Sequence, residues 1–151
     1  MRYLPDDKVL VRALATVKKY DSATYARMDS DKQWVVTSDM SALPPVVQND
    51  LLGTTAFGTT YPVGNVGADI AVTFLNTEYI DEWADHYSVD RNYFAAAVLV
   101  HEYRHAHQTT RDARKAEPPA FAAGSAFAAK LPNPSGAMIK ALSDETEKDF
   151  A

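Results

Sequence analysis

The 151-residue chain is long enough to bury a hydrophobic core, and its length predicts a single domain over residues 1–151. Its apolar fraction of 46% and charged fraction of 23% are those of an ordinary globular protein and argue against disorder. A net charge of −5 without a cluster of Lys and Arg argues against a nucleic-acid partner, and the absence of cysteine excludes disulfides, cysteine zinc sites and thiol nucleophiles.

The N-terminal residues give no sign of a signal peptide. Charged side chains are scattered through residues 1–20, so no apolar run of signal-peptide length occurs there, and no apolar stretch in the chain has the length of a transmembrane helix. The expected location is therefore the cytoplasm, with export by a route without a cleaved signal left open. We expect no membrane partner.

The first third of the chain predicts short helices and one strand. Apolar residues at helical spacing after an acidic start predict a helix over about residues 6–20, and a short helical turn over residues 22–28 should follow. The β-branched and aromatic residues 34–38 predict a short strand, and the apolar residues after a Pro-Pro pair allow a short helix near residues 46–52.

The middle of the chain contains the clearest strand. Residues 53–67 are rich in glycine and threonine and predict an irregular or hairpin-like stretch, for which a binding loop and an ordinary connector are the alternatives. Residues 68–75 alternate large apolar and smaller side chains and predict a strand. A helix capped at Asn76–Thr77 should then run to about Asp85.

A longer helix follows, and it contains the sequence His-Glu-x-x-His. Capped by Ser88, it is predicted to run from about Val89 to Gln108. His101 and His105 are four residues apart and therefore project from one face of this helix, where both imidazoles can reach one metal ion. Zn²⁺ favours neutral nitrogen ligands at this spacing, and Glu102 can hold and deprotonate a metal-bound water. The motif therefore predicts a zinc site.

This stretch resembles the active-site helix of zinc metallopeptidases of the zincin class. The resemblance implies hydrolysis at a zinc ion, with Glu102 as the general base. It also likens the strand 68–75 to the zincin edge strand that pairs with the substrate backbone, and the alternative for this strand is a role in the core alone.

Catalytic zinc sites usually have three protein ligands and one open position, so a further ligand must lie elsewhere in the chain. The metzincin pattern would need Gly at position 108 and His or Asp at position 111, but the chain has Gln108 and Arg111. Peptide deformylases take a cysteine ligand, which this chain lacks. Both of these arrangements are therefore excluded.

The remaining arrangement is that of gluzincins, in which a Glu on a following helix completes the site. Glu117 fits this role because apolar and small residues follow it at helical spacing, which predicts a helix from about Glu117 to Lys130. Pro118 and Pro119 should then occupy the first turn of this helix. Asp112 is the rival ligand, although its basic surroundings favour a solvated loop carboxylate.

Two further histidines and the last helix complete the predictions. His86 and His107 are expected at the surface, and the alternative for His107 is a place at the cleft edge, where it would assist a transition-state oxyanion. A last helix should be capped by Ser135 and end in an acidic tail, residues 144–149.

The sequence therefore predicts an α+β fold, a small mainly helical zincin-like domain with a short β-sheet packed beside the active-site helix. We expect it to hydrolyse a peptide or amide bond in a peptide or protein substrate. Zn²⁺ would be the cofactor, held by His101, His105 and Glu117, with Glu102 as the catalytic residue. The alternative is a non-enzymatic interaction domain with a structural or degenerate metal site. The sequence indicates no oligomeric state.

Overall fold

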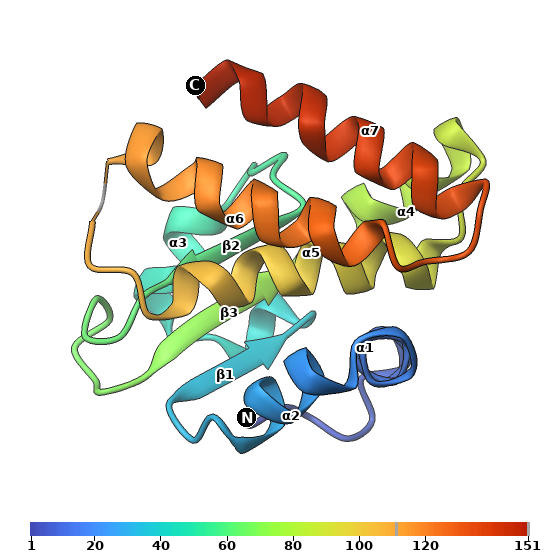
Figure 1. Ribbon diagram of the computed structural model, residues 1–151. Helices are drawn as coiled ribbons and strands as arrows, with labels where there is room; N and C mark the ends of the chain where they lie inside the picture. The colour runs from blue at the N-terminus through green and yellow to red at the C-terminus, as the bar shows by residue number, and fades with distance from the viewer. Residues whose placement is uncertain (111, 151) are drawn as a thin grey trace.

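A computed structural model describes residues 1–110 and 112–150, so Arg111 and Ala151 lie outside the described residues. The described residues form α-helices, two short 3-10 helices and one small β-sheet (Figure 1). In chain order the elements are α1 (Lys8–Tyr20), α2 (Ser22–Ser30), β1 (Trp34–Thr37), η1 (Met40–Ala42), α3 (Pro45–Leu51), β2 (Gly58–Tyr61), β3 (Ala71–Leu75), α4 (Thr77–Tyr87), α5 (Arg91–Ala106), α6 (Ala113–Ala128), α7 (Ser135–Glu147) and η2 (Lys148–Phe150). The predicted α+β, mainly helical fold is confirmed.

The three strands form one mixed sheet in the order β1-β3-β2. β3 is parallel to β1 and antiparallel to β2, and in this register Thr60 lies opposite Thr73. The likening of residues 68–75 to an edge strand is wrong, because β3 is the central strand and its backbone is paired on both sides. β2 lies at one edge of the sheet. It comes from the glycine-rich stretch 53–67, and its antiparallel pairing with β3 agrees with the hairpin-like structure expected there.

The sheet has two covered faces, which explains why every residue of β3 is buried. Val72 and Phe74 pack with Leu43 and residues of α3 in a small apolar cluster. Ala71 and Leu75 point to the other face and belong to the main core, which they share with α1 and α5. The alternation predicted for this strand is therefore present, but both sides of it are buried.

Helix α5 lies at the centre of the molecule. In Figure 1 it runs between α6 and α7 on one side and the sheet and α1 on the other. Most of its residues are buried, including the small residues Ala95, Ala96 and Ala97, which allow its neighbours to pack closely. The His-Glu-x-x-His sequence therefore lies on a buried central helix, beside the sheet.

The start of α5 differs from the prediction. Asp90, and not Ser88, is the N-cap: its side chain accepts hydrogen bonds from the backbone N–H groups of Asn92 (2.8 Å) and Tyr93 (3.1 Å). Ser88 instead ends α4 in a left-handed conformation with φ of 53°. Two helices therefore meet at a sharp turn, and Ser88 belongs to the first of them.

Helix α6 also starts earlier than predicted. Asp112 accepts a hydrogen bond from the backbone N–H of Arg114 (3.0 Å) and so caps a helix that begins at Ala113. The prediction of a helix from Glu117 with the prolines in its first turn is wrong, since Pro118 and Pro119 lie inside α6. They are tolerated because the carbonyl groups that lose their donors belong to exposed residues and can bind water.

None of the helices in residues 1–110 and 112–150 combines the length and the apolar character needed to cross a membrane.

Candidate metal centre

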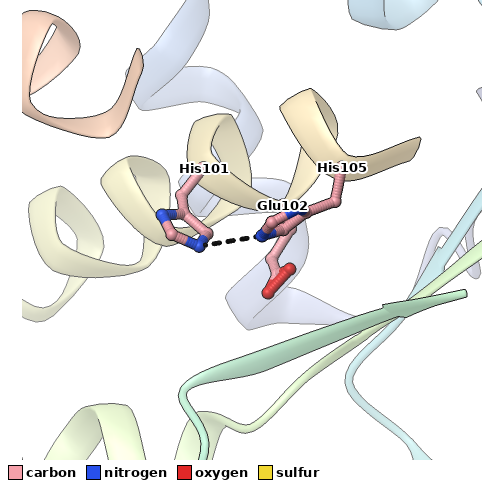
Figure 2. A group of neighbouring side chains, drawn as sticks. All are labelled: His101, Glu102 and His105. Carbon is pink, nitrogen blue, oxygen red and sulfur yellow. Dashed lines mark hydrogen bonds between the residues drawn. The ribbon is translucent and has the colours of Figure 1, made fainter. Parts of the chain in front are cut away.

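Three side chains from two helices converge at the candidate metal centre. His101 and His105 project from successive turns of α5, and Figure 2 shows their rings pointing toward each other. Their Nε2 atoms are 3.2 Å apart. The carboxylate of Glu117, on α6, lies against both: its oxygens are 3.2 Å from His101 Nε2 and 3.0 Å from His105 Nε2. The structure therefore brings together the three residues that the sequence predicted as ligands.

The spacing of these donor atoms suits a tetrahedral metal ion. Zinc binds histidine nitrogen and carboxylate oxygen at about 2.1 Å, so two ligand atoms on a tetrahedron around it lie about 3.4 Å apart. The three separations in this cluster are 3.0 to 3.2 Å. A metal ion therefore fits this cluster after side-chain shifts of about 0.3 Å.

The electrostatics of the cluster follow from the same contacts. Burial alone would raise the pKa of Glu117, but hydrogen bonds from His101 and His105 outweigh burial and lower it to about 2. Burial alone would lower the pKa of His105, but the hydrogen bond to Glu117 and the nearby Glu102 carboxylate raise it to about 8. A positive ion at the centre would take the place of the proton that His105 holds there.

Gln108 contacts the ring nitrogen of His105 that faces away from Glu117. Its side-chain oxygen lies 2.6 Å from His105 Nδ1, and its amide nitrogen donates to the backbone carbonyl of Ala116 over 3.0 Å. Because the Gln108 oxygen can only accept, Nδ1 carries the proton and Nε2 is the atom directed at Glu117. The same side chain ties the end of α5 to the turn of α6 that carries Glu117. Such a second partner fixes the orientation of a metal-binding imidazole.

Glu102 extends from α5 toward the sheet, and its carboxylate lies beside the two imidazoles, as Figure 2 shows; the residue is only 4% exposed. Its Oε2 accepts a hydrogen bond from Thr60 Oγ1 on β2 over 3.0 Å. Burial raises the pKa of the Glu102 carboxyl above its ordinary value, while the charges of His101 and His105 and the bond from Thr60 act in the opposite direction. The donor atoms of Glu102, His101 and His105 all lie within 4.8 Å of one another.

A chain of hydrogen bonds across the sheet ends at Glu102. The indole N–H of Trp34 donates to Thr73 Oγ1 over 2.9 Å, and Thr73 Oγ1 lies 2.8 Å from Thr60 Oγ1. Thr73 accepts from the Trp34 indole. Thr60 donates its only hydroxyl proton to the Glu102 carboxylate, so Thr73 is the donor to Thr60. Each of the three strands therefore contributes one residue to this series of hydrogen bonds, and each of its donors is directed toward the Glu102 carboxylate.

A cavity of about 470 Å³ opens beside His101, Glu102 and Glu117. It lies among α4, α5, α6, α7 and the segment before β2, and its walls carry the rings of Phe57, Tyr79, Trp83, Phe94, Phe121 and Phe150. Gly58 also lines it, and a side chain at this position would collide with Glu102, since an added Cβ would lie 2.7 Å from Glu102 Cγ. The cluster is therefore open on one side, toward a large space.

The remaining predicted residues lie away from the cluster. Asp112, the rival third ligand, is exposed and caps α6. His107 is exposed, as expected, and is paired with Asp31 on the far side of α5 from the cluster. His86 is exposed at the end of α4 and packs against Tyr87. Of the acidic residues proposed as the third ligand, only Glu117 touches both histidines.

Sequence reasoning missed Thr60, Gln108 and Gly58. Thr60 is 42 positions from Glu102, and no local pattern connects them. A signal for the strand did exist, because Thr59, Thr60 and Tyr61 are β-formers that follow a glycine. The sequence showed Gln108 only as a departure from the metzincin pattern and gave no sign of its contact with His105.

Comparison of the chain with protein-family models, with curated proteins and with solved structures found no match. The interpretation of the site therefore depends on its geometry and chemistry.

Proposed function

We propose that this protein is a zinc-dependent hydrolase of peptide or amide bonds. His101, His105 and Glu117 would hold Zn²⁺. The observation that carries this proposal is the spacing of the three donor atoms, 3.0 to 3.2 Å, next to an open cavity. Three protein donors with a free fourth side are the arrangement of catalytic zinc sites, whereas structural sites use four protein ligands.

Zinc bound there would make a water molecule acidic and polarise the scissile carbonyl. Glu102 would accept the proton of the attacking water and deliver it to the leaving amine. Two features of this residue support the role. Its pKa is raised by burial, which makes the carboxylate a stronger base, and Thr60 fixes one of its oxygens from the side of the sheet.

The second candidate function is an interaction domain whose metal site only stabilises the pair of helices α5 and α6. The contact of Glu117 with both histidines would serve that role as well. The cavity beside the cluster favours the hydrolase, because a purely structural site needs no access for a substrate.

The first test is metal binding. We expect about one zinc per chain after reconstitution, measured by elemental analysis. Glu117→Ala should weaken zinc binding by about 100-fold or more in a chelator competition, since loss of a supporting residue alone costs about 10–100-fold. Asp112→Ala is the matched control and should bind zinc like the parent. The ligand assignment is wrong if Asp112→Ala loses zinc and Glu117→Ala retains it.

The second test is hydrolysis. The zinc-loaded protein is incubated with a mixed peptide library, and the products are identified by mass spectrometry, with a chelated sample as the control. We expect new cleavage products only in the zinc-loaded sample. A stable zinc complex that cleaves no peptide would favour the interaction domain.

A further inference from the structure

The carboxylates and the imidazole that line the cavity beside the candidate metal centre all belong to that centre. These groups are His101, Glu102 and Glu117. The rest of the described lining is neutral, and most of it is apolar or aromatic. A ligand that fills this cavity must therefore place a polar group at the centre and an uncharged group in the remainder.

The aromatic residues form two walls. On one wall the ring of Phe57 stacks on Tyr79 with centroids 4.7 Å apart and meets Trp83 and Phe94 edge-on at 5.2 and 5.0 Å. These contacts hold α4, α5 and the segment before β2 together. The wall is therefore built by mutual ring packing and keeps its shape without a ligand.

The other wall comes from α6 and the 3-10 helix η2. Phe121 packs edge-on against the imidazole of His101, with centroids 4.5 Å apart, and stacks on Phe150 at 5.7 Å. Ile139 and Leu142 of α7 continue this apolar surface. One ring of the second wall thus touches a residue of the metal centre, so a group bound between the walls lies next to the reacting atoms.

We infer that the cavity binds a large aromatic or aliphatic side chain of the substrate, attached beside the amide bond that is cleaved. This inference rests on the proposed function, whose substrate class it names. Burying a side chain of this kind contributes about 10- to 100-fold in affinity. A charged side chain would lose its water in a region whose described lining offers no opposite charge, so it would be rejected.

A peptide is favoured over a free apolar molecule as the occupant for two reasons. The charged end of the cavity suits an amide group, which a hydrocarbon lacks. In addition, Gly58 of the edge strand β2 forms part of the lining, which places an unpaired strand edge where an extended backbone could lie.

The first experiment needs neither zinc nor activity. Trp34 and Trp83 are the only tryptophans, so the protein gives two indole N–H signals in a ¹H–¹⁵N NMR spectrum, and Trp83→Phe identifies the one in the cavity wall. We expect N-acetyl-phenylalanine amide to shift the Trp83 signal, while N-acetyl-aspartate amide and N-acetyl-alanine amide leave it in place. An unshifted Trp83 signal, or an equal shift with the aspartate compound, would overturn the inference.

The second experiment uses zinc-loaded protein and three hydroxamates that share one metal-binding head. Acetohydroxamate carries no side group, 3-phenylpropanohydroxamate carries an aromatic group, and succinic acid monohydroxamate carries a charge. We expect the aromatic compound to bind about 10- to 100-fold more tightly than acetohydroxamate, and the charged compound to bind no better.

A variant that fills the cavity tests whether the preference for the aromatic hydroxamate arises there. Ser143 of α7 lines the cavity, so Ser143→Phe should remove most of the preference for the aromatic compound and leave acetohydroxamate binding unchanged. Ala141→Phe, at an exposed position on the same helix, is the matched control and should keep the preference. Equal binding of the three hydroxamates would contradict the inference, as would an unchanged preference in folded Ser143→Phe.

A failure of the proposed function can be distinguished from a failure of the inferred substrate class. If the proposed function is wrong, the protein binds no zinc or cleaves no peptide, yet the Trp83 signal still responds to the aromatic compound. If the substrate class is wrong, the protein cleaves peptides without regard to apolar residues, and the Trp83 signal does not respond.

Discussion

Thr60 of the edge strand β2 donates a hydrogen bond of 3.0 Å to the carboxylate of Glu102 on α5. This contact is the point where the sheet touches the His-Glu-x-x-His helix through a polar group. A carboxylate oxygen only accepts, so Thr60 uses its single hydroxyl proton in this bond and accepts from Thr73, whose Oγ1 lies 2.8 Å away. The sheet therefore orients one oxygen of the proposed general base.

Replacing Thr60 should show whether its hydroxyl orients the Glu102 carboxylate for catalysis or only stabilises the fold. Thr60→Val removes the hydroxyl at nearly constant volume and leaves one oxygen of a buried carboxylate without its donor, which should destabilise the fold by about 1.5–3 kcal/mol. We expect kcat to fall about 10- to 100-fold, with zinc retained and KM little changed. Thr60→Ser keeps the hydroxyl and should restore most of the activity. Activity kinetics, zinc analysis and urea unfolding measure these effects, and equal kcat values for both variants would contradict the role of Thr60.

Two glycines near Glu102 and His101 should respond differently to alanine. A Cβ at Gly58 would lie 2.7 Å from Glu102 Cγ, whereas a Cβ at Gly124 would lie 3.5 Å from His101 Cβ, an ordinary contact. Gly58→Ala should therefore displace the carboxylate and lower kcat at least about tenfold while zinc stays bound. Gly124→Ala should leave zinc affinity and kcat close to those of the parent. The reverse order of effects would show that the carboxylate position is not what limits activity.

Glu102→Gln should keep zinc and the fold but abolish hydrolysis, because an amide cannot accept a proton from water. Its stability is informative as well. Burial raises the pKa of Glu102, so the ionised form destabilises the folded protein as the pH rises through that pKa. The variant should therefore unfold at a urea concentration no lower than the parent does at pH 8. A variant with full activity on a cleaved peptide would exclude Glu102 as the base.

The stability of the metal-free protein should depend on pH through Glu117 and His105. The pKa of Glu117 is lowered to about 2, so its contribution to stability is present above its unfolded pKa and is lost as the pH falls through 2. The pKa of His105 is raised to about 8, so its contribution is present below the unfolded pKa near 6.5 and is lost as the pH rises through 8. Both contributions are complete between the ordinary pKa of Glu117, 4.5, and that of His105, 6.5, so the metal-free protein should be most stable in this pH range.

Zinc binding requires neutral His105, so zinc affinity should rise about tenfold per pH unit below pH 8 and level off above it. Chelator competition between pH 6.5 and 9.5 measures this dependence. His107→Gln, which changes an exposed histidine outside the cluster, is the control and should leave the dependence unaltered. A zinc affinity that does not change between pH 6.5 and pH 8 would show that His105 loses no proton to the metal.

Local patterns in the sequence predicted the helices and the motif well. The first helix, the strand at Trp34 and the helix with His101 and His105 depend on spacing within one element, which the sequence shows directly. The contact between Glu117 and the two histidines was also predicted, because helical spacing and the need for a third donor both indicated it. Whether these residues bind zinc stays a prediction.

Relations between distant segments could not be predicted in this way. The position of β3 in the centre of the sheet depends on the pairing of strands far apart in the sequence, and the hydrogen bond from Thr60 to Glu102 depends on that pairing in turn. The start of α6 was wrong for a different reason. The rule that excludes proline from helix interiors was applied to Pro118 and Pro119, although an N-cap at Asp112 and exposure to water allow the helix to begin earlier.

These two prolines weaken the connection between the first turns of α6 and the rest of the helix. They supply no N–H groups to the carbonyls of Arg114 and Lys115, so the turn that carries Glu117 lacks two of the bonds that join it to the rest of the helix. The side chain of Gln108 provides a substitute link through Ala116. We therefore expect the amide protons of residues 115–117 to exchange with deuterium faster than those of residues 120–128, as they would if this turn opened locally while the core stayed folded.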